Sequence, residues 1–207
     1  MTADPDCAVI VFAKAPRPGL AKTRLIPALG EDGAAHLAER LLERALAAAA
    51  QAGLGAIELC CTPDTGHPAF AALAARHRIA LGLQGDGDLG ARMDRALTGA
   101  LRGHPRALLI GTDAPDLDAG FLRQAAAALQ THDAVFGPAL DGGYTLVGLT
   151  RAAPALFESM PWSSASVMAE TRARLRRLGL RHAELRTLAD IDTPADLVHL
   201  PAGWLPA

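Results

Sequence analysis

Short apolar runs alternate with longer segments of helical periodicity along the chain, and this alternation constrains the fold more than any other feature of the sequence. The first run, AVIVFA at 8–13, is apolar at every position, as in a strand buried on both faces of a sheet. A segment at 32–51 then places leucine and alanine on one helical face, and Gly53 supplies a stop signal. The pattern predicts a strand followed by a helix.

The same alternation continues beyond Gly53. Strands are predicted at 56–61, 79–83 and 107–110, and helices at 68–76, 89–101 and 118–130. Strands that alternate with helices in this way indicate a mainly parallel, Rossmann-like sheet with helices on both faces. We therefore predict an α/β fold.

The rhythm changes after residue 130. Two short strands, 134–137 and 144–149, are separated by ALDGG rather than by a helix, which predicts an antiparallel element near 134–149. A helix at 166–178, a strand at 182–185 and a helical turn opened by Thr193-Pro194 complete the pattern. No Ser/Gly-rich linker divides the chain, so we expect a single domain over 1–207.

Composition excludes several classes of function. Twenty Lys and Arg residues oppose twenty-two Asp and Glu residues, and the net charge of -2 provides no positive field for nucleic acid. The run at 8–13 is too short for a signal sequence or a membrane span. Cys7, Cys60 and Cys61 fit buried thiols of a reducing compartment better than a disulfide framework. We expect a cytoplasmic location, whereas the oligomeric state is left open.

The loop after the first strand carries a cluster of cations. Lys14, Lys22 and Arg24 lie close to Gly19 and Thr23 in KAPRPGLAKTRL, and backbone amides freed by the glycine together with the cations could cradle a polyphosphate. The loop lacks the glycine spacing of a Walker A motif, which disfavours a P-loop kinase or ATPase. The alternative is a basic loop exposed to solvent.

A carboxylate follows the predicted strand 107–110. In LLIGTDAPDL, the strand ends in Gly-Thr and delivers Asp113 to the carboxyl edge of the sheet, where ligands of such folds bind. A hard carboxylate there suits Mg²⁺ or Mn²⁺ bound with nucleotide phosphates. Asp116 is interpreted as the N-cap of the next helix, and Asp118 is the other candidate for that cap.

The segment ADIDTP places two carboxylates on alternate residues. In an extended segment, Asp190 and Asp192 would project to the same side, and Asp192 would be a second metal ligand. The alternative is that Asp192 or Thr193 caps the helix opened by Pro194. The metal interpretation depends on the pairing with Asp113.

Two glycine-rich turns are further candidates. Asp141, before Gly-Gly, is a candidate for acceptor binding or for orienting the metal ligands, although Gly-Gly also simply makes hairpins. Gln84, Gly85 and Asp88 open a loop that would suit base or ribose recognition, and Asp88 is equally well an N-cap. Trp162, before two serines, is interpreted as a hydrophobic staple rather than a sugar platform.

The motifs together resemble a family of GT-A-like glycosyltransferases marked by FAKxPxPGxxKTRL, GTDxPxL, DGGYxLxGL and DxDTPxDL. They stand here as FAKAPRPGLAKTRL, GTDAPDL, DGGYTLVGL and DIDTPADL. The layout is also similar to that of molybdenum-cofactor and phospholactate guanylyltransferases. The resemblance implies that Lys22 and Arg24 bind phosphates, that Asp113 binds the metal and that Asp192 is a second metal ligand.

The predicted function is therefore metal-dependent nucleotidyl or glycosyl transfer, with Mg²⁺ or Mn²⁺ as cofactor. The partners would be a nucleoside triphosphate or nucleotide sugar and a small-molecule acceptor, without nucleic acid or a membrane span. Lys22, Arg24, Asp113 and Asp141 are the candidate catalytic residues. A nucleotide-binding module without turnover is the alternative from a different class, and unused carboxylates at two strand ends argue against it.

Overall fold

The computed structural model describes residues 6–204. Within them, one sheet has the strand order β3-β2-β1-β4-β6-β5-β7. The strands are β1 (Cys7–Lys14), β2 (Ile57–Thr62), β3 (Ala80–Leu83), β4 (Arg106–Ile110), β5 (Ala134–Pro138), β6 (Tyr144–Leu149) and β7 (His182–Glu184). The α-helices are α1 (Ile26–Ala52), α2 (Pro68–His77), α3 (Leu89–Ala100), α4 (Ala119–Ala128) and α5 (Val167–Arg177). Short 3-10 helices are η1 (Thr23–Leu25), η2 (Pro154–Leu156) and η3 (Pro194–His199).

The sheet is mainly parallel, as predicted. β1 pairs in parallel with β2 and β4, β2 with β3, and β5 with β7. β6 is antiparallel to both of its neighbours, β4 and β5, which confirms the antiparallel element predicted near 134–149. Among the described strands, only β6 therefore runs against the others.

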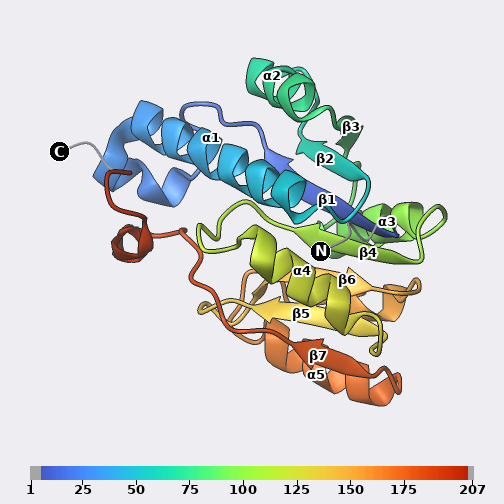
Figure 1. Cartoon of the computed structure of the whole chain (residues 1–207). Helices are drawn as coiled ribbons and strands as arrows, with labels where there is room; N and C mark the ends of the chain where they lie inside the picture. Colours follow the sequence, from blue (N-terminus) through green and yellow to red (C-terminus); the bar gives the residue numbers. More distant parts are fainter. Residues whose placement is uncertain (1–5, 205–207) are drawn as a thin grey trace.

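Alternation along β1 explains why helices are needed on both faces. Val9 and Val11 belong to one buried cluster, whereas Ile10 and Phe12 belong to another. Successive side chains of a strand point to opposite faces, so a continuous apolar run requires cover on each side. In Figure 1, α1, α2 and α4 cover the near face of the sheet, and α3 and α5 lie behind it.

The first helix begins earlier than the predicted start at residue 32. α1 starts at Ile26, with Pro27 in its first turn, where the missing N–H of proline costs little. The helix is kinked at Gly30, whose φ of 71° is not helical, and Gly53 ends it with a φ of 65°. Pro27, which suits a loop as well as a first helical turn, hid this earlier start from the sequence pattern. None of the helices in 6–204 is both long and apolar enough to cross a membrane.

Candidate functional site

Three chain segments meet at the carboxyl ends of the parallel strands. Lys14 ends β1, Asp113 follows β4 by three residues, and the segment after β7 brings Asp190 and Asp192 to the same edge. These four side chains line one cavity of about 730 Å³. The cationic loop and the carboxylates thus converge at the edge of the sheet where the sequence predicted a ligand site.

Lys22 lies at the centre of this convergence. Its ammonium is 2.7 Å from an Asp113 carboxylate oxygen and 3.7 Å from one of Asp192, and it also donates to the carbonyl of Ile191. The Lys22 side chain is only 7% exposed, whereas those of Asp113 and Asp192 are 47% and 45% exposed. The ammonium is therefore held between two carboxylates that still face solvent.

Arg24 is placed differently. It lies 2.8 Å from the second carboxylate oxygen of Asp192, and its side chain is 64% exposed. An exposed ion pair of this kind contributes little to stability, so its guanidinium can exchange partners readily. Arg24 is thus the more available of the two cations for a ligand in the cavity.

The backbone around Asp192 is fixed from two directions. Ile191 is fully buried against Leu25 and Leu37, and its N–H donates to the carbonyl of Asp113 at 2.9 Å. Burial of one such side chain stabilises by about 2 kcal/mol. Because Ile191 points into the core, the flanking Asp190 and Asp192 project toward the cavity, which agrees with the predicted alternation.

Asp196 holds the same segment from the other end. Its carboxylate accepts from the backbone N–H groups of Asp192 and Thr193, at 3.1 and 2.6 Å, and from the Thr193 hydroxyl at 2.8 Å. Burial opposes the charged form, but these hydrogen bonds outweigh it and lower the pKa of Asp196. Thr193 is the N-cap of η3, as the capping alternative predicted, and Asp192 remains directed at Lys22 and Arg24.

Negative charge accumulates at this edge of the cavity. Burial is the main cause that raises the pKa of Asp190 to about 6, and the carboxylates of Asp141, Asp192 and Asp113 add to it. Within 6–204, however, no three acidic, histidine or cysteine side chains are grouped so that they could hold a metal ion alone. A bound metal would therefore complete its coordination with ligand oxygens and water.

The donor set fits a hard divalent cation. Asp113 and Asp192 offer carboxylate oxygens, which Mg²⁺ and Mn²⁺ prefer, and Mg²⁺ commonly uses one or two protein carboxylates together with phosphate oxygens. The structure already accommodates a cation between them, because the Lys22 ammonium lies there.

The remaining cavity wall comes from the turn between β5 and β6 and from the segment before α5. The carboxylate of Asp141 accepts from the Gly143 N–H at 2.7 Å and lines the cavity. Tyr144 makes edge contacts with Phe136 and Trp162, at centroid distances of 5.2 and 6.3 Å.

Trp162 was not selected as a site residue from the sequence. It lines the cavity, and α5 begins with Ser166 as its N-cap, so Trp162 is too far from the helix to be its staple. That interpretation was wrong. The sequence signal that could have identified Trp162 as a site residue is a lone aromatic side chain close to three serines. In the structure, no side chain caps α5 through a hydrogen bond.

The Gln84 loop is only partly at the site. Gln84 is buried and lines the cavity, donating from its amide to the carbonyls of Ala13 and Cys60 at 3.3 and 3.1 Å. Asp88 caps α3 by accepting from Ala91, and it lines a different cavity, between α3 and η2. Of the two roles predicted for Asp88, the structure therefore shows the N-cap of a helix.

Other predicted residues fall into place around the loop. Thr23 lines the cavity, whereas Gly19 turns the chain with a φ of 74° and Gly85 with a φ of 77°. The cap of α4 is Asp118, which accepts from Phe121 at 2.7 Å, so the assignment of that role to Asp116 was wrong. Asp116 is exposed, and its carbonyl accepts from Arg186 at 3.1 Å.

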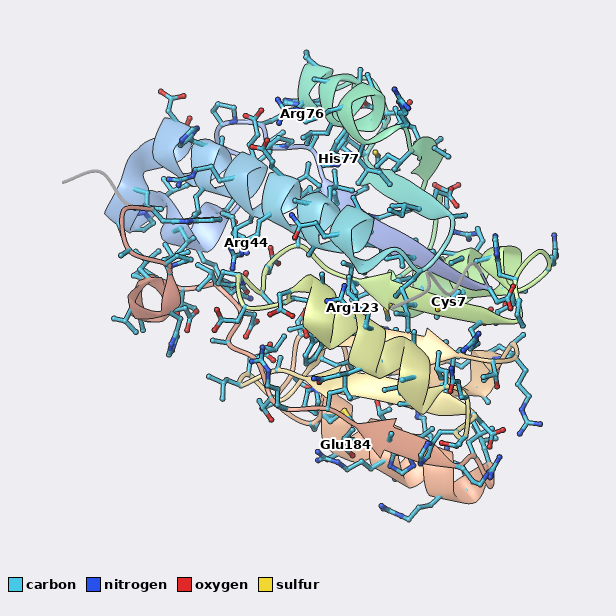
Figure 2. The ribbon with its side chains drawn as sticks, viewed as in Figure 1. Cys7, Arg44, Arg76, His77, Arg123 and Glu184 are labelled. Carbon is cyan, nitrogen blue, oxygen red and sulfur yellow. The ribbon has the colours of Figure 1, made fainter. Side chains whose placement is uncertain are left out.

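Arg44 connects the loop after β4 to the rest of the molecule. It donates to the carbonyl of Pro115, two residues from Asp113, and its guanidinium lies 5.8 Å from the ring centroid of Trp204. Arg40 covers the same ring at 4.4 Å. Figure 2 shows Arg44 reaching from α1 toward that loop. The cavity edge is thus supported by α1 and by the C-terminal segment.

The geometry can be compared with known proteins. A family described as "Uncharacterized protein conserved in bacteria (DUF2064)" matches residues 45–164, more than half of the chain. The chain belongs to the DUF2064 family. The match contains GTDAPDL and DGGYTLVGL, whereas the first and last motifs lie outside it. No curated protein sequence matched.

Solved structures share the fold of this DUF2064 chain. A candidate nucleotide-diphospho-sugar transferase from Desulfovibrio desulfuricans G20 is 33% identical, with a TM-score of 0.84 over 93% of this chain and 84% of that one. The CMP:2-keto-3-deoxy-manno-octonic acid synthetase complexed with CTP is 13% identical, with a TM-score of 0.57 over 94% and 96%. Rv0371c of Mycobacterium tuberculosis H37Rv, complexed with manganese, is 18% identical, with a TM-score of 0.57 over 94% and 97%.

The fold is therefore an α/β fold of the nucleotide-diphospho-sugar transferase type. Its structural relatives include this candidate nucleotide-diphospho-sugar transferase and a nucleotidyl transferase from Methanothermobacter thermautotroptrophicus, which is 16% identical with a TM-score of 0.60 over 96% of this chain and 97% of that one. The three distant relatives show the fold alone.

Proposed function

We propose that this chain is a metal-dependent transferase that takes a nucleotide donor, either a nucleoside triphosphate or a nucleotide sugar. The observation that carries the proposal is the convergence of Lys22 and Arg24 with Asp113 and Asp192 in one cavity at the carboxyl edge of the sheet. Phosphates require cations, and a divalent metal requires carboxylates. This cavity brings both together.

Each residue has a role in the proposed reaction. Lys22 and Arg24, with Lys14, bind phosphate oxygens of the donor, and Asp113 and Asp192 hold Mg²⁺ or Mn²⁺. The metal would neutralise charge on the phosphates as the bond to the leaving group breaks. Asp141, which lines the same cavity, positions the acceptor. Catalysis of either transfer then rests on positioning and charge neutralisation.

The two transfers differ in the bond that breaks. In nucleotidyl transfer, the acceptor attacks the α-phosphorus of a nucleoside triphosphate and pyrophosphate leaves. In glycosyl transfer, the acceptor attacks the sugar carbon bonded to the diphosphate and a nucleoside diphosphate leaves. The relative with 33% identity is a candidate nucleotide-diphospho-sugar transferase, which favours the sugar donor.

Calorimetric titration tests the shared part of the proposal. Mg²⁺ or Mn²⁺ is present while a panel of nucleoside triphosphates and nucleotide sugars is titrated into the protein. We expect Asp113→Asn to abolish metal-dependent binding and to leave the fold intact. Asp116→Asn is the matched control, because Asp116 is exposed on the same loop and does not line the cavity. Unchanged binding by Asp113→Asn would remove the metal assignment.

Product analysis then separates the two transfers. Release of pyrophosphate from a bound nucleoside triphosphate identifies nucleotidyl transfer, and release of a nucleoside diphosphate from a nucleotide sugar identifies glycosyl transfer. Tight, metal-dependent nucleotide binding without either product over a broad acceptor set would instead favour the binding module.

A further inference from the structure

Lys22 occupies the position that a metal ion would need. Its ammonium lies 2.7 Å from Asp113 and 3.7 Å from Asp192, so its single positive charge already lies between both proposed metal ligands. The side chain is almost entirely buried, and the carbonyl of Ile191 accepts from the same ammonium. A divalent cation cannot approach both carboxylates closely while this ammonium stays in place.

The protein alone also offers an incomplete metal site. No third acidic, histidine or cysteine side chain within 6–204 completes a ligand group with Asp113 and Asp192. Mg²⁺ and Mn²⁺ need further oxygen ligands, which a polyphosphate can supply. The same polyphosphate is the natural partner for a lysine ammonium on a flexible side chain. One ligand can therefore complete the metal site and draw Lys22 away from it.

We propose that Lys22 is a tethered cation that fills the metal position of the free protein, so that a divalent metal binds tightly only together with a polyphosphate that takes Lys22 over. This inference rests on the proposed function and adds an order to it. Lys22 changes partner from carboxylate to phosphate, and the metal takes its former place. The linkage is reciprocal: the factor by which the polyphosphate tightens metal binding equals the factor by which the metal tightens polyphosphate binding.

The test measures protein-bound Mn²⁺ by equilibrium dialysis, with the pyrophosphate concentration equal on both sides of the membrane, so that Mn²⁺ held by pyrophosphate alone does not count as bound. Pyrophosphate serves as the probe, because both donor classes contain a diphosphate. Wild type is expected to bind Mn²⁺ weakly alone and at least tenfold more tightly with saturating pyrophosphate. Lys22→Gln, which keeps a hydrogen-bond donor but not the charge, is expected to bind Mn²⁺ alone at least tenfold more tightly than wild type. Its gain on adding pyrophosphate should be correspondingly smaller.

Arg17→Met is the matched control. Arg17 lies on the same loop and pairs with Asp64 at 3.2 Å, away from the cavity carboxylates, so its loss removes one positive charge without freeing the metal position. Mn²⁺ binding by Arg17→Met should stay within about twofold of wild type. The double variant Lys22→Gln with Asp113→Asn should lose the affinity gained by the single variant, which locates the new binding at Asp113.

Thermal unfolding provides a second measurement. Without its ammonium, the acidic pair repels itself, so the melting temperature of Lys22→Gln should fall and Mn²⁺ alone should restore it, because binding to the folded state stabilises that state. Lys22→Met repeats the test should the glutamine variant fail to fold. Unchanged or weaker binding of Mn²⁺ by both Lys22 variants would overturn the inference.

Failure of the proposed function gives a different result. In that case the Asp113→Asn variant would bind Mn²⁺ in the presence of pyrophosphate as tightly as wild-type protein does, whatever the Lys22 variants do. If instead that binding depends on Asp113 while Lys22→Gln shows no gain without pyrophosphate, the metal assignment stands and the role of Lys22 as a competing cation is wrong.

Discussion

Removal of the Asp196 carboxylate separates the stability of the segment after β7 from its role at the cavity. Asp196 accepts three hydrogen bonds, from the N–H groups of Asp192 and Thr193 and from the Thr193 hydroxyl. Asp196→Ala leaves all three donors without this acceptor. Loss of a helix cap typically costs about 1 kcal/mol, within a range of about 0.5–2 kcal/mol. For a chain of this size, 1 kcal/mol lowers the melting temperature by about 2–4 °C.

Asp196→Ala should also weaken ligand binding. The backbone N–H of Asp192, a proposed metal ligand, donates to the Asp196 carboxylate, so the loss of that carboxylate loosens the position of Asp192. Asp118→Ala is the matched control: Asp118 caps α4 through one hydrogen bond to the Phe121 N–H, and its side chain does not line the cavity. Urea denaturation should show a loss of about 1 kcal/mol in both variants. Mn²⁺ titration with pyrophosphate should show weakened binding in Asp196→Ala alone.

Two results would refute this reasoning. Equal weakening of binding in both variants would show that lost stability, rather than the position of Asp192, controls the affinity. Full stability in Asp196→Ala would show that the three hydrogen bonds to Asp196 are replaced at no cost by water.

Three further outcomes are expected. Gly142→Ala should disrupt the turn before β6, because Gly142 has a φ of 90° and a Cβ on it would lie 2.2 Å from the carbonyl oxygen of Ala165. Thermal unfolding should show a lower melting temperature, and calorimetric titration should show weaker nucleotide binding. The Arg172 guanidinium donates two hydrogen bonds to Glu184 and lowers the pKa of that carboxyl, so Glu184→Gln should be less stable by about 1 kcal/mol or less at pH 7. That difference should vanish as the pH falls through the lowered pKa, and urea unfolding over a series of decreasing pH values from pH 7 would check it. Burial is the main cause that raises the pKa of Cys61 to about 12, so a disulfide reagent at pH 7 should label this thiol only after unfolding.

The sequence predicted the sheet well because its signals are local. The strands expected from the sequence are present, and the central strands β1 and β4 are buried along nearly their whole length, which demands continuous apolar runs. The start of α1 was missed because Pro27 suits a first helical turn as well as a loop. Alternation around Ile191 predicted the direction of Asp190 and Asp192, because an apolar residue between two carboxylates seeks the core.

The partners of the site residues were harder to predict. The resemblance implies a phosphate role for Lys22, which stays a prediction, but it does not predict the contacts of Lys22 with Asp113 and Asp192, which lie far away in the sequence. Nothing in the loop around Lys22 encodes that contact. Trp162 was missed for the same reason, because its approach to Tyr144 depends on how the segment before α5 folds over the β5–β6 turn.

The reversed strand explains how a small sheet gathers so many polar groups at one edge. Parallel strands present their carboxyl ends there, which places Lys14 at the end of β1 and Asp113 after β4. β6 is antiparallel to β5, so the carboxyl end of β5 and the amino end of β6 both lie at this edge. The short turn that joins these two ends carries Asp141. A parallel strand in that position would need a crossover that begins at this edge and ends at the opposite one. The reversal of β6 therefore brings Asp141, the proposed acceptor residue, into the same cavity as Asp113, the proposed metal ligand. A purely parallel strand order would not place a turn at this edge with so short a connection.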